Sequence, residues 1–415
     1  MSISDYRMTL GGDPEILLTS GKSKGSAGHV IYARDVLDES KTGGGNITYD
    51  GMIAEINVIP DTCRERLIYN YSDILNNIFT QADSGKFDLL TSPAGKVKKS
   101  VLESVPDQDK IFGCDPDVNA YTGKKNKVTI SGLKHQKRYG GGHLHFGISS
   151  PITKTFYRNN ISLIIKLMDY ICGNTCVLLD RDPANAVRRK VYGKAGSYRI
   201  QPHGIEYRVL SNFWLRGPQL VSIVYKLGRV AINVAADCRI RENEEAMDFV
   251  DYIFDKIPEQ KVVDAINNND FNKAAENAEI IIPELISIGG ISMEFWTPVQ
   301  YLIERGIDNI LGNMRNEWKN HENGVISWWR RHLSTISDDI EAVILDTYSA
   351  TVKNCILKDL YKYVSDSLHS ALDRPLLPSP KKLCGINIYE VNLPCDIEIS
   401  PDNIPPIREN TRRER

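Results

Sequence analysis

The chain has 415 residues, with 51 Lys and Arg against 53 Asp and Glu and a formal net charge of −2. This balance argues against a protein that coats nucleic acid, since such domains are strongly basic. Hydrophobic residues make up 41% and charged residues 25%, which excludes global disorder and supplies a sizeable core. The sequence has neither a run of 18 apolar residues nor a signal-peptide pattern, and its eight cysteines are spread thinly. We therefore expect a cytoplasmic protein with reduced thiols, without nucleic-acid or membrane partners.

The first part of the chain is predicted to alternate strands with helices. Short apolar segments bounded by glycine-rich turns predict strands at residues 15–18, 53–59, 143–148 and 204–210. In three of them, charged or polar side chains recur at every second position, which places those groups on one face of a sheet. Apolar spacing predicts helices at residues 65–79 and 157–173. Residues 1–237 are thus predicted to form an α+β domain with a mainly antiparallel sheet.

The rest of the chain has a different pattern. Apolar residues recur about every 3.6 positions, with few glycines, in residues 242–256, 272–282, 296–318, 326–336 and 338–372. This spacing predicts a helical region over residues 238–374. Residues 375–415 are rich in proline and end in a charged segment, which predicts an extended C-terminal arm.

The first two chemically informative segments carry acids. Asp13 and Glu15 flank a proline and would point to the same side of a strand, which suits the bracketing of two divalent cations. A solvated acidic pair at a strand start is the alternative. Glu55 lies inside an apolar strand, where an ionised carboxylate is costly unless it is paired, bound to metal or on an exposed face. Asp50 precedes it in a glycine-containing turn and is a candidate general base.

The next two segments carry histidines and cations. His143 and His145 share a strand face with glycines on both sides, which favours metal ligation or phosphate contact over a core role. Glu206 and Arg208 alternate on an apolar strand, which suggests a metal-binding acid beside a phosphate-binding guanidinium. Six cations lie within 21 residues and could also form a solvated face: Arg188, Arg189, Lys190, Lys194, Arg199 and Arg208. Together the four segments predict a site for a nucleoside triphosphate with magnesium, without a P-loop.

The order of these motifs resembles a known family. Gly12-Asp-Pro-Glu-Ile, Glu55-Ile-Asn, Gly142-His-Leu-His-Phe-Gly and Gly204-Ile-Glu-Tyr-Arg resemble the carboxylate–amine ligases of the glutamine synthetase and glutamate–cysteine ligase superfamily. The closest resemblance is to the phage-encoded COOH–NH2 ligases of type 2. It implies a glutamine synthetase-like fold and an ATP- and Mg2+-dependent ligase that forms an amide or peptide bond through an acyl phosphate. The carboxylate and amine would belong to an amino acid, peptide or protein. A phage-encoded enzyme would act in the host cytoplasm, and it could form a homo-oligomer.

The resemblance also assigns roles to individual residues. The metal ligands would be Asp13, Glu15, Glu55, His143 and Glu206, holding two or three Mg2+ ions, or Mn2+. The predicted ATP-binding residues are Arg188, Lys194, Arg199 and Arg208, where Lys194 departs from the family's arginine. Arg208, His145 near the substrate and Asp50 as the base complete the predicted catalytic set. The ammonium-site and flap residues of true glutamine synthetases have no counterpart, which argues against ammonia as the amine.

Three other functions are compatible with parts of this pattern. A phosphotransferase of the guanidino-kinase type shares the fold in part and would accumulate a phosphorylated guanidine. A zinc hydrolase could use His143, His145 and an acid, but it would leave the six-cation cluster without a purpose. A non-catalytic phage structural or assembly protein could retain the ligase fold and use its helical region and arm as the working surface.

Overall fold

In the computed structural model, the described residues are 3–20, 28–85, 87–90, 92–111, 117–126, 131–319, 382–383 and 386–387. The chain divides into two compact units, Met1–Thr335 and Ile336–Arg415. The described residues of the second unit form a two-stranded hairpin of β13 (Lys382–Leu383) and β14 (Ile386–Asn387). The predicted helices at residues 326–336 and 338–372 and nearly all of the predicted arm lie outside the described residues.

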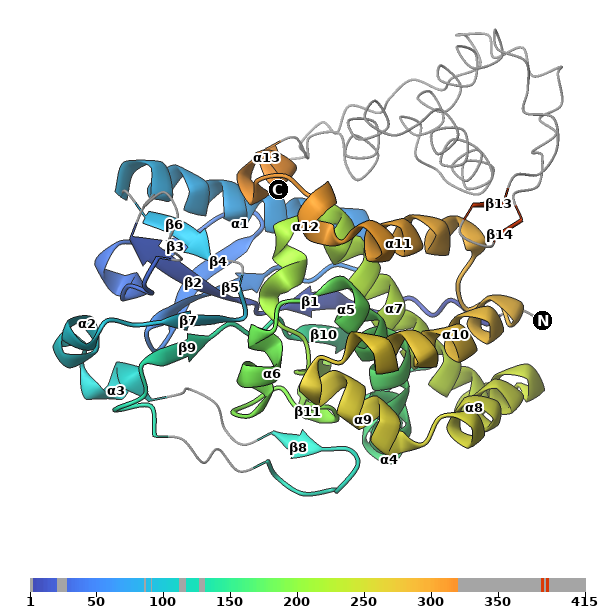
Figure 1. Ribbon diagram of the computed structural model, residues 1–415. Coiled ribbons are helices and arrows are strands. Elements are labelled where there is room, and N and C mark those ends of the chain that lie inside the picture. Colours follow the sequence, from blue (N-terminus) through green and yellow to red (C-terminus); the bar gives the residue numbers. More distant parts are fainter. Residues whose placement is uncertain are drawn as a thin grey trace, which may run out of the picture. The chain divides into compact units, whose positions relative to one another are not determined.

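The first unit contains two five-stranded antiparallel sheets (Figure 1). One, the β10 sheet, has the strand order β1 (Leu10–Gly12), β10 (Leu144–Gly147), β12 (Gly204–Tyr207), β11 (Ser197–Gln201), β8 (Val118–Asn119). The other, the β5 sheet, has the order β3 (Ser40–Lys41), β4 (Gly45–Asp50), β5 (Ile53–Val58), β2 (Glu15–Ser20), β6 (Phe87–Leu90). A small third sheet pairs β7 (Ala94–Lys96) with β9 (Lys137–Tyr139).

The predicted mixture of helices with antiparallel strands is confirmed, but the strands lie in two main sheets and not in one. The reason is local. Only Asp13 and Pro14 separate β1 from β2, yet β1 pairs with β10 while β2 pairs with β5 and β6. Proline has no backbone N–H to donate to a ladder, so the chain can leave one sheet and enter the other at this point.

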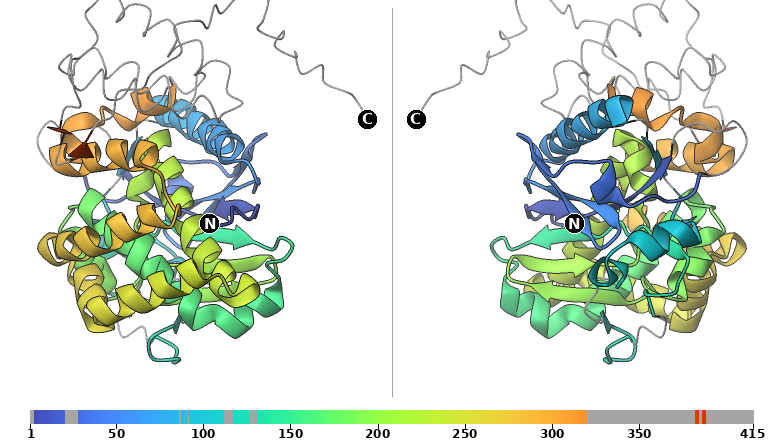
Figure 2. Two further views of the ribbon diagram at one scale, coloured as in Figure 1. Left: turned by 90° about the vertical axis from the view of Figure 1, so that its right-hand side faces the viewer. Right: turned by 90° about the vertical axis from the view of Figure 1, so that its left-hand side faces the viewer.

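Helices pack against both sheets. Before β11 the chain forms α1 (Arg64–Gly85), α2 (Lys99–Ser104), α3 (Asp107–Lys110), α4 (Lys154–Met168), α5 (Asn174–Leu179) and α6 (Ala184–Arg189). After β12 it forms α7 (Pro218–Ala236), α8 (Glu244–Lys256), α9 (Glu259–Asn268), α10 (Phe271–Ser287), α11 (Met293–Arg305), α12 (Ile307–Ile310) and α13 (Met314–Lys319). Figure 2 shows α1 over the β5 sheet and α4 along the β10 sheet.

Helix α7 forms the centre of the core. It packs against α1, α4 and β10, and nearly all of its residues are buried. Its polar residues recur at three- and four-residue spacing, from Gln219 and Ser222 through Lys226 and Arg229 to Asn233, which is helical periodicity that the sequence interpretation above did not include. The continuous helical stretch Lys154–Leu179 is long and apolar enough to cross a membrane, but 78% of its apolar window is buried, as in the core helix of a folded domain.

The helices after α7 correct one prediction and confirm others. Helices α8 and α10 confirm those expected at residues 242–256 and 272–282. The single helix expected at residues 296–318 is wrong, because Gly306 adopts a φ of 80° that ends α11, and α12 and α13 follow as separate turns. Since α10 packs against α5, the predicted boundary between residues 237 and 238 falls inside the first unit. The division into 1–237, 238–374 and 375–415 stays a prediction.

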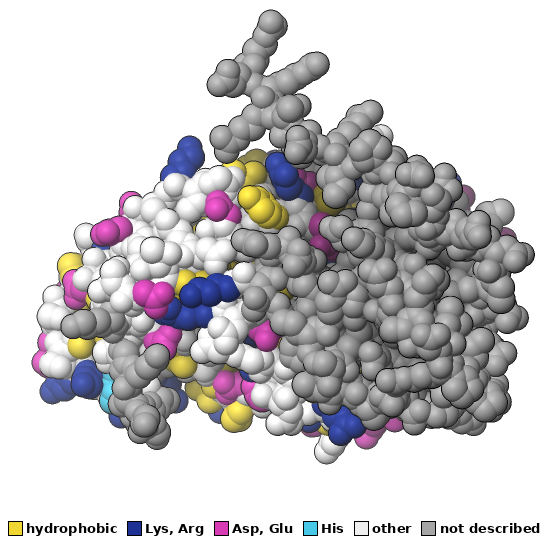
Figure 3. All heavy atoms as spheres, turned by 90° about the horizontal axis from the view of Figure 1, so that it is seen from above, with side chains coloured by type: hydrophobic (Ala, Val, Ile, Leu, Met, Phe, Trp, Pro, Cys, Tyr) yellow, Lys and Arg dark blue, Asp and Glu magenta, His cyan; other side chains and the backbone are white. Residues whose placement is uncertain are grey.

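The described surface is mixed in charge. On the face shown in Figure 3, described Lys and Arg side chains lie interspersed with Asp and Glu. Large exposed hydrophobic residues are far apart in the sequence: Ile59, Tyr69, Ile111, Leu133, Ile148, Ile240 and Tyr252. Single exposed apolar residues are normal on soluble domains. The concentrated charge of this molecule lies instead where the two main sheets meet.

Candidate functional site

The predicted acids and histidines, together with Arg199 and Arg208, come together at the junction of the β10 and β5 sheets. In the β10 sheet, His145 lies opposite Glu206, and Glu206 lies opposite Arg199, so their side chains share one face across three strands. In the β5 sheet, Glu15 lies directly opposite Glu55. Asp13 lies between β1 and β2, where the chain passes from the β10 sheet to the β5 sheet, and so lies near the site residues of both sheets.

Asp13, His143, His145 and Glu206 form one group, here called the histidine–carboxylate cluster. Oδ1 of Asp13 lies 3.1 Å from Nε2 of His145 and 3.2 Å from Nδ1 of His143. Nδ1 of His143 also lies 3.6 Å from Oε1 of Glu206. The ligand atoms of Asp13, His145 and Glu206 all lie within 4.8 Å of one another. Three such atoms at this separation could hold one metal ion.

Two arginines supply positive charge beside this cluster. Nη1 of Arg208 contacts Oε1 of Glu206 and lies 3.2 Å from Nδ1 of His143. Nε of Arg208 lies 2.6 Å from Oδ1 of Asp117, a carboxylate that is 4% exposed. Arg199 lies farther away, at 3.9 Å from Glu206 and 3.8 Å from Asp117. Arg208 therefore contacts two buried acids, and Arg199, which lies near the same two acids, is 26% exposed.

The charges of this cluster change how its members titrate. Burial acts to raise the pKa of Asp13, but hydrogen bonds with His143 and His145 hold it well below its usual value. Burial acts to lower the pKa of His145, but the hydrogen bond and charge of Asp13 raise it on balance. Burial likewise opposes ionisation of Glu206, but the charges of His143 and Arg208 lower its pKa. The negative charge of Asp13 and Glu206 is thus balanced by the neighbouring imidazole and guanidinium groups.

Glu15, Asp50 and Glu55 form a second group, here called the three-carboxylate cluster, which is not compensated. Burial, followed by repulsion from Asp13 and Glu15, raises the pKa of Glu55 to about 8. Burial and the charge of Glu15 raise the pKa of Asp50 to about 6. Burial is the first cause of both shifts, and repulsion between neighbouring carboxylates adds to it. A divalent cation bound here would favour the ionised carboxylates.

Glu15 is held in place by buried partners. Its Oε2 accepts hydrogen bonds from the backbone N–H of Gly141 at 2.6 Å and from the hydroxyl of Tyr192 at 2.5 Å. A Cβ at Gly141 would lie 2.5 Å from Nε2 of His143, so a larger residue cannot fit without moving that ring. The glycine therefore lets a strand of one sheet approach a carboxylate of the other.

The donor set fits divalent cations. Carboxylate oxygens suit Mg2+ and Mn2+, and imidazole nitrogens suit Mn2+ and other transition metals. Within the described part of the chain, Nε2 of His143 is buried and has no hydrogen-bond partner. The residues whose donor atoms lie close enough together to hold one cation are Asp13, His145 and Glu206, so His145, predicted to lie near the substrate, belongs to this set. Glu15, Glu55 and His143 stay predicted ligands.

The predicted ATP-binding residues do not all lie together. Arg199 and Arg208 reach the histidine–carboxylate cluster. Arg188 on α6 is fully buried, contacts the carbonyl of Val209 and lies 5.1 Å over the ring of Tyr192. Lys194 is half-buried in the loop before β11. In this structure Arg188 supports the residue that binds Glu15, and its predicted contact with ATP stays a prediction.

Sequence analysis missed several residues that shape the site. Asp117 pairs with Arg208, and its only sequence signal is that Cys114-Asp-Pro-Asp117 echoes Gly12-Asp-Pro-Glu15. Gln201 donates to Oε2 of Glu206 from the neighbouring strand. His203, at the β11–β12 turn, stacks on His145 with ring centroids 5.0 Å apart. Nδ2 of Asn212 donates to the backbone carbonyl of Glu15 at 2.8 Å. These contacts depend on tertiary pairing that no local pattern encodes.

The fold and the site define a mixed α/β protein with antiparallel sheets and a candidate metal centre at their junction. Residues 118–258 match the family model of the phage phiEco32-like COOH.NH2 ligase-type 2 proteins. This is the family that the motifs resemble, and the match confirms the resemblance for that segment. The family's name implies a carboxylate–amine ligase. No curated protein matches the chain. The matched segment contains His143, His145, Glu206 and Arg208, whereas the three-carboxylate cluster precedes it.

Proposed function

We propose that this protein is an ATP- and Mg2+-dependent ligase with a glutamine synthetase-like fold, which joins a carboxylate to an amine through an acyl phosphate. The family match supports the ligase class. The observation that carries the rest is the contrast between two neighbouring groups. The three-carboxylate cluster, in which the pKa of Glu55 rises to about 8, lies next to the histidine–carboxylate cluster, whose Glu206 pairs with Arg199 and Arg208. Carboxylates that bind cations next to guanidinium groups suit a phosphoryl group in transfer.

Each side chain has a role in this proposal. Asp13, Glu15, Glu55, His143 and Glu206 would hold Mg2+, which neutralises triphosphate charge when bound. Arg199, the more exposed arginine, would bind phosphoryl oxygens, and Arg208 would orient Glu206 while adding positive charge at the reacting centre. His145 is 17% exposed; it would face the substrate and could add a nitrogen donor to the cation held by Asp13 and Glu206.

The reaction takes place in two steps. A carboxylate oxygen of the substrate attacks the γ-phosphorus of ATP, forming an acyl phosphate and releasing ADP. The amine nitrogen then attacks the acyl carbon, phosphate leaves, and one proton of the amine is lost. Asp50 would accept that proton, because a carboxyl with a pKa of about 6 is mostly ionised at pH 7 yet basic enough to take it.

The test measures ADP release by the purified full chain with Mg2+, ATP and pooled amino acids, peptides and polyamines. Mass spectrometry then seeks a product lighter by one water than its two substrates combined. Hydroxylamine in place of the amine converts an acyl phosphate into a hydroxamate, which marks the intermediate. Glu206→Gln should abolish both signals, and Glu279→Gln, an exposed site on α10, should preserve them.

Other outcomes separate the alternatives. A phosphorylated guanidine without hydroxamate would favour the phosphotransferase. ATP-independent hydrolysis that requires Zn2+ would favour the hydrolase. Absence of both ATP binding and ADP release would favour a non-catalytic assembly protein. Wild-type turnover by Glu206→Gln would overturn the site assignment.

A further inference from the structure

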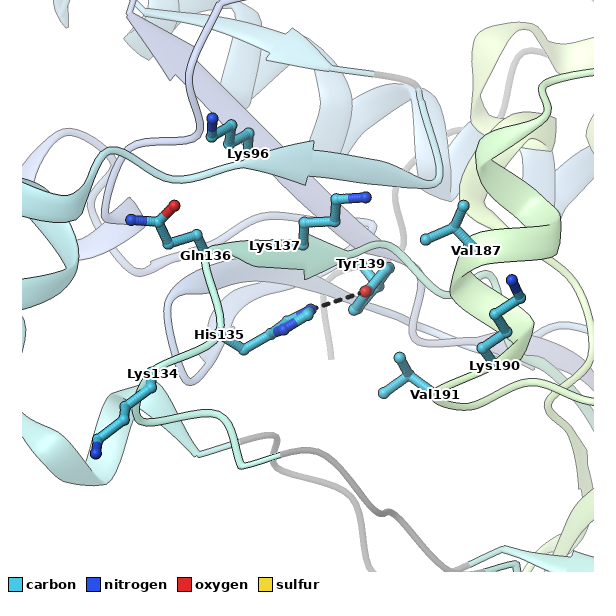
Figure 4. A pocket seen from close by; sticks show the side chains of 9 residues that line it. All are labelled: Lys96, Lys134, His135, Gln136, Lys137, Tyr139, Val187, Lys190 and Val191. Carbon is cyan, nitrogen blue, oxygen red and sulfur yellow. Dashed lines mark hydrogen bonds between the residues drawn. The ribbon is translucent and has the colours of Figure 1, made fainter.

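A pocket with a cavity volume of about 540 Å³ lies beside the candidate site, between the small β7–β9 sheet and α6 (Figure 4). Four lysines line it: Lys96, Lys134, Lys137 and Lys190. None of its lining residues is acidic, and no described acidic side chain pairs with any of the four lysines. Elsewhere in the described structure, lysines do form ion pairs, as Lys166 does with Glu259. Uncompensated cations around a concavity favour an anionic ligand.

The wall of this basic pocket is ordered by buried contacts. The ring of His135 stacks on Tyr139 with centroids 5.7 Å apart, and its Nε2 lies 2.8 Å from the Tyr139 hydroxyl. Arg138 is 3% exposed and donates to the backbone carbonyls of His135 and Lys137 at 2.7 and 2.9 Å. Burial and the charges of Arg138 and Lys137 lower the pKa of His135, as expected where the local potential is positive. These contacts fix the segment that carries Lys137, and Lys96 lies directly opposite Lys137 on the neighbouring strand.

The pocket has an apolar floor that leads to the candidate site. Val187 and Val191 of the α6 region line it, and Figure 4 shows Lys137 extending toward Val187. Val191 packs with Tyr139 and Tyr192 in one hydrophobic cluster. The hydroxyl of Tyr192 binds Glu15 of the three-carboxylate cluster. The pocket and the acid clusters thus lie on either side of one pair of tyrosines, whose ring centroids are 6.5 Å apart.

We propose that the basic pocket binds an acidic segment of the ligase substrate, so that the substrate is a peptide carrying several carboxylates besides the one that reacts. This inference rests on the proposed function for its reaction, but the binding can be measured without it. Lysine is a hydrated point charge on a flexible stem, which suits several carboxylates at varied positions. An adenine base is uncharged and would leave the four lysines unpaired, and the triphosphate is needed at the acid clusters, where its cations bind.

The test measures binding of fluorescein-labelled hexaglutamate by fluorescence anisotropy, without ATP. The informative variant is Lys137→Gln/Lys190→Gln. The matched control is Lys41→Gln/Lys124→Gln, which removes the same charge from two exposed lysines outside the pocket. We expect the pocket variant to bind about tenfold more weakly, as for the loss of two partly screened ion pairs, and the control to bind like the wild type. Binding of MgATP should be the same in all three proteins.

Three results would overturn the proposal. The first is absence of hexaglutamate binding by the wild type, or an equal loss in the control. The second is loss of MgATP binding in the pocket variant, which would make the pocket part of the nucleotide site. The third is tighter binding of a single-stranded oligonucleotide that the same two substitutions abolish. Peptide binding without ADP release would support the role of the pocket and contradict the proposed ligase activity. ADP release without peptide binding would support the ligase activity and contradict the role of the pocket.

Discussion

Asp169 offers a direct test of how a buried carboxyl affects the stability of β12, the strand that carries Glu206. It lies in the π-helical turn Asp169–Gly173 between α4 and α5 and is completely buried. Its Oδ1 accepts a hydrogen bond of 2.7 Å from the hydroxyl of Tyr207 on β12. Burial raises the pKa of this carboxyl from 3.8 to about 7. The perturbation is Asp169→Asn, which keeps the acceptor oxygen and removes the titration.

The sign follows from proton linkage. Between pH 3.8 and about 7 the folded protein retains a proton that the unfolded chain releases, so the free energy of unfolding falls as pH rises through this window. From pH 4.5 to 7.5 the loss amounts to about 3 kcal/mol for the wild type, since each pKa unit corresponds to about 1.4 kcal/mol. The asparagine variant should lack this loss.

Urea unfolding followed by circular dichroism at pH 4.5, 6.0 and 7.5 measures the effect. The quantity of interest is the difference between wild type and variant, because other titrating groups cancel in it. We expect that difference to move in favour of the variant as pH rises. Asp251→Asn, at an exposed position on α8, is the control and should give a constant difference. A difference for Asp169→Asn that does not change with pH would refute the reasoning.

Three further predictions concern the site itself. Gly141→Ala should weaken Mn2+ binding at least tenfold by calorimetry, because its Cβ would lie 2.5 Å from Nε2 of His143; unchanged affinity would contradict the packing argument. Tyr192→Phe removes the hydrogen bond to Glu15 and should cost about 1 kcal/mol of stability in urea unfolding, with no change as the opposing result. Mg2+ or Mn2+ at about one hundred times its dissociation constant should add about 2.7 kcal/mol to the free energy of unfolding, and Glu206→Gln should lose this gain.

The parts of the site that follow from sequence are those set by local periodicity. His145, Glu206 and Glu55 each lie in an apolar strand where alternate residues face opposite sides, so their shared faces could be predicted. Which strands pair could not be. That Glu15 lies opposite Glu55 depends on the chain changing sheets after Gly12, which is a tertiary event.

Burial accounts for the other misses. Arginine is a residue type that often binds phosphate, but the side chain of Arg188 is fully buried against Tyr192. No local sequence pattern distinguishes a buried arginine from an exposed one. Asp117 pairs with Arg208 from the position just before β8, an element too short to show periodicity. The buried helix α7 is a different case, because its polar residues, among them Lys226 and Arg229, do recur with helical spacing, so this helix could have been predicted.

The pairing of β1 with β10 has a consequence for synthesis on the ribosome. Leu10 pairs with Phe146, and Ser4 and Tyr6 donate hydrogen bonds to Asp237. At typical translation rates the first strand would wait roughly 7 to 27 seconds before its partner emerges, and longer before the helix that anchors the residues before β1. Until then the backbone edge of β1 stays open to other chains. The residues around β1 can therefore take their final place only after the segments they bind have been made. A protein without β1 would leave one edge of β10 unpaired.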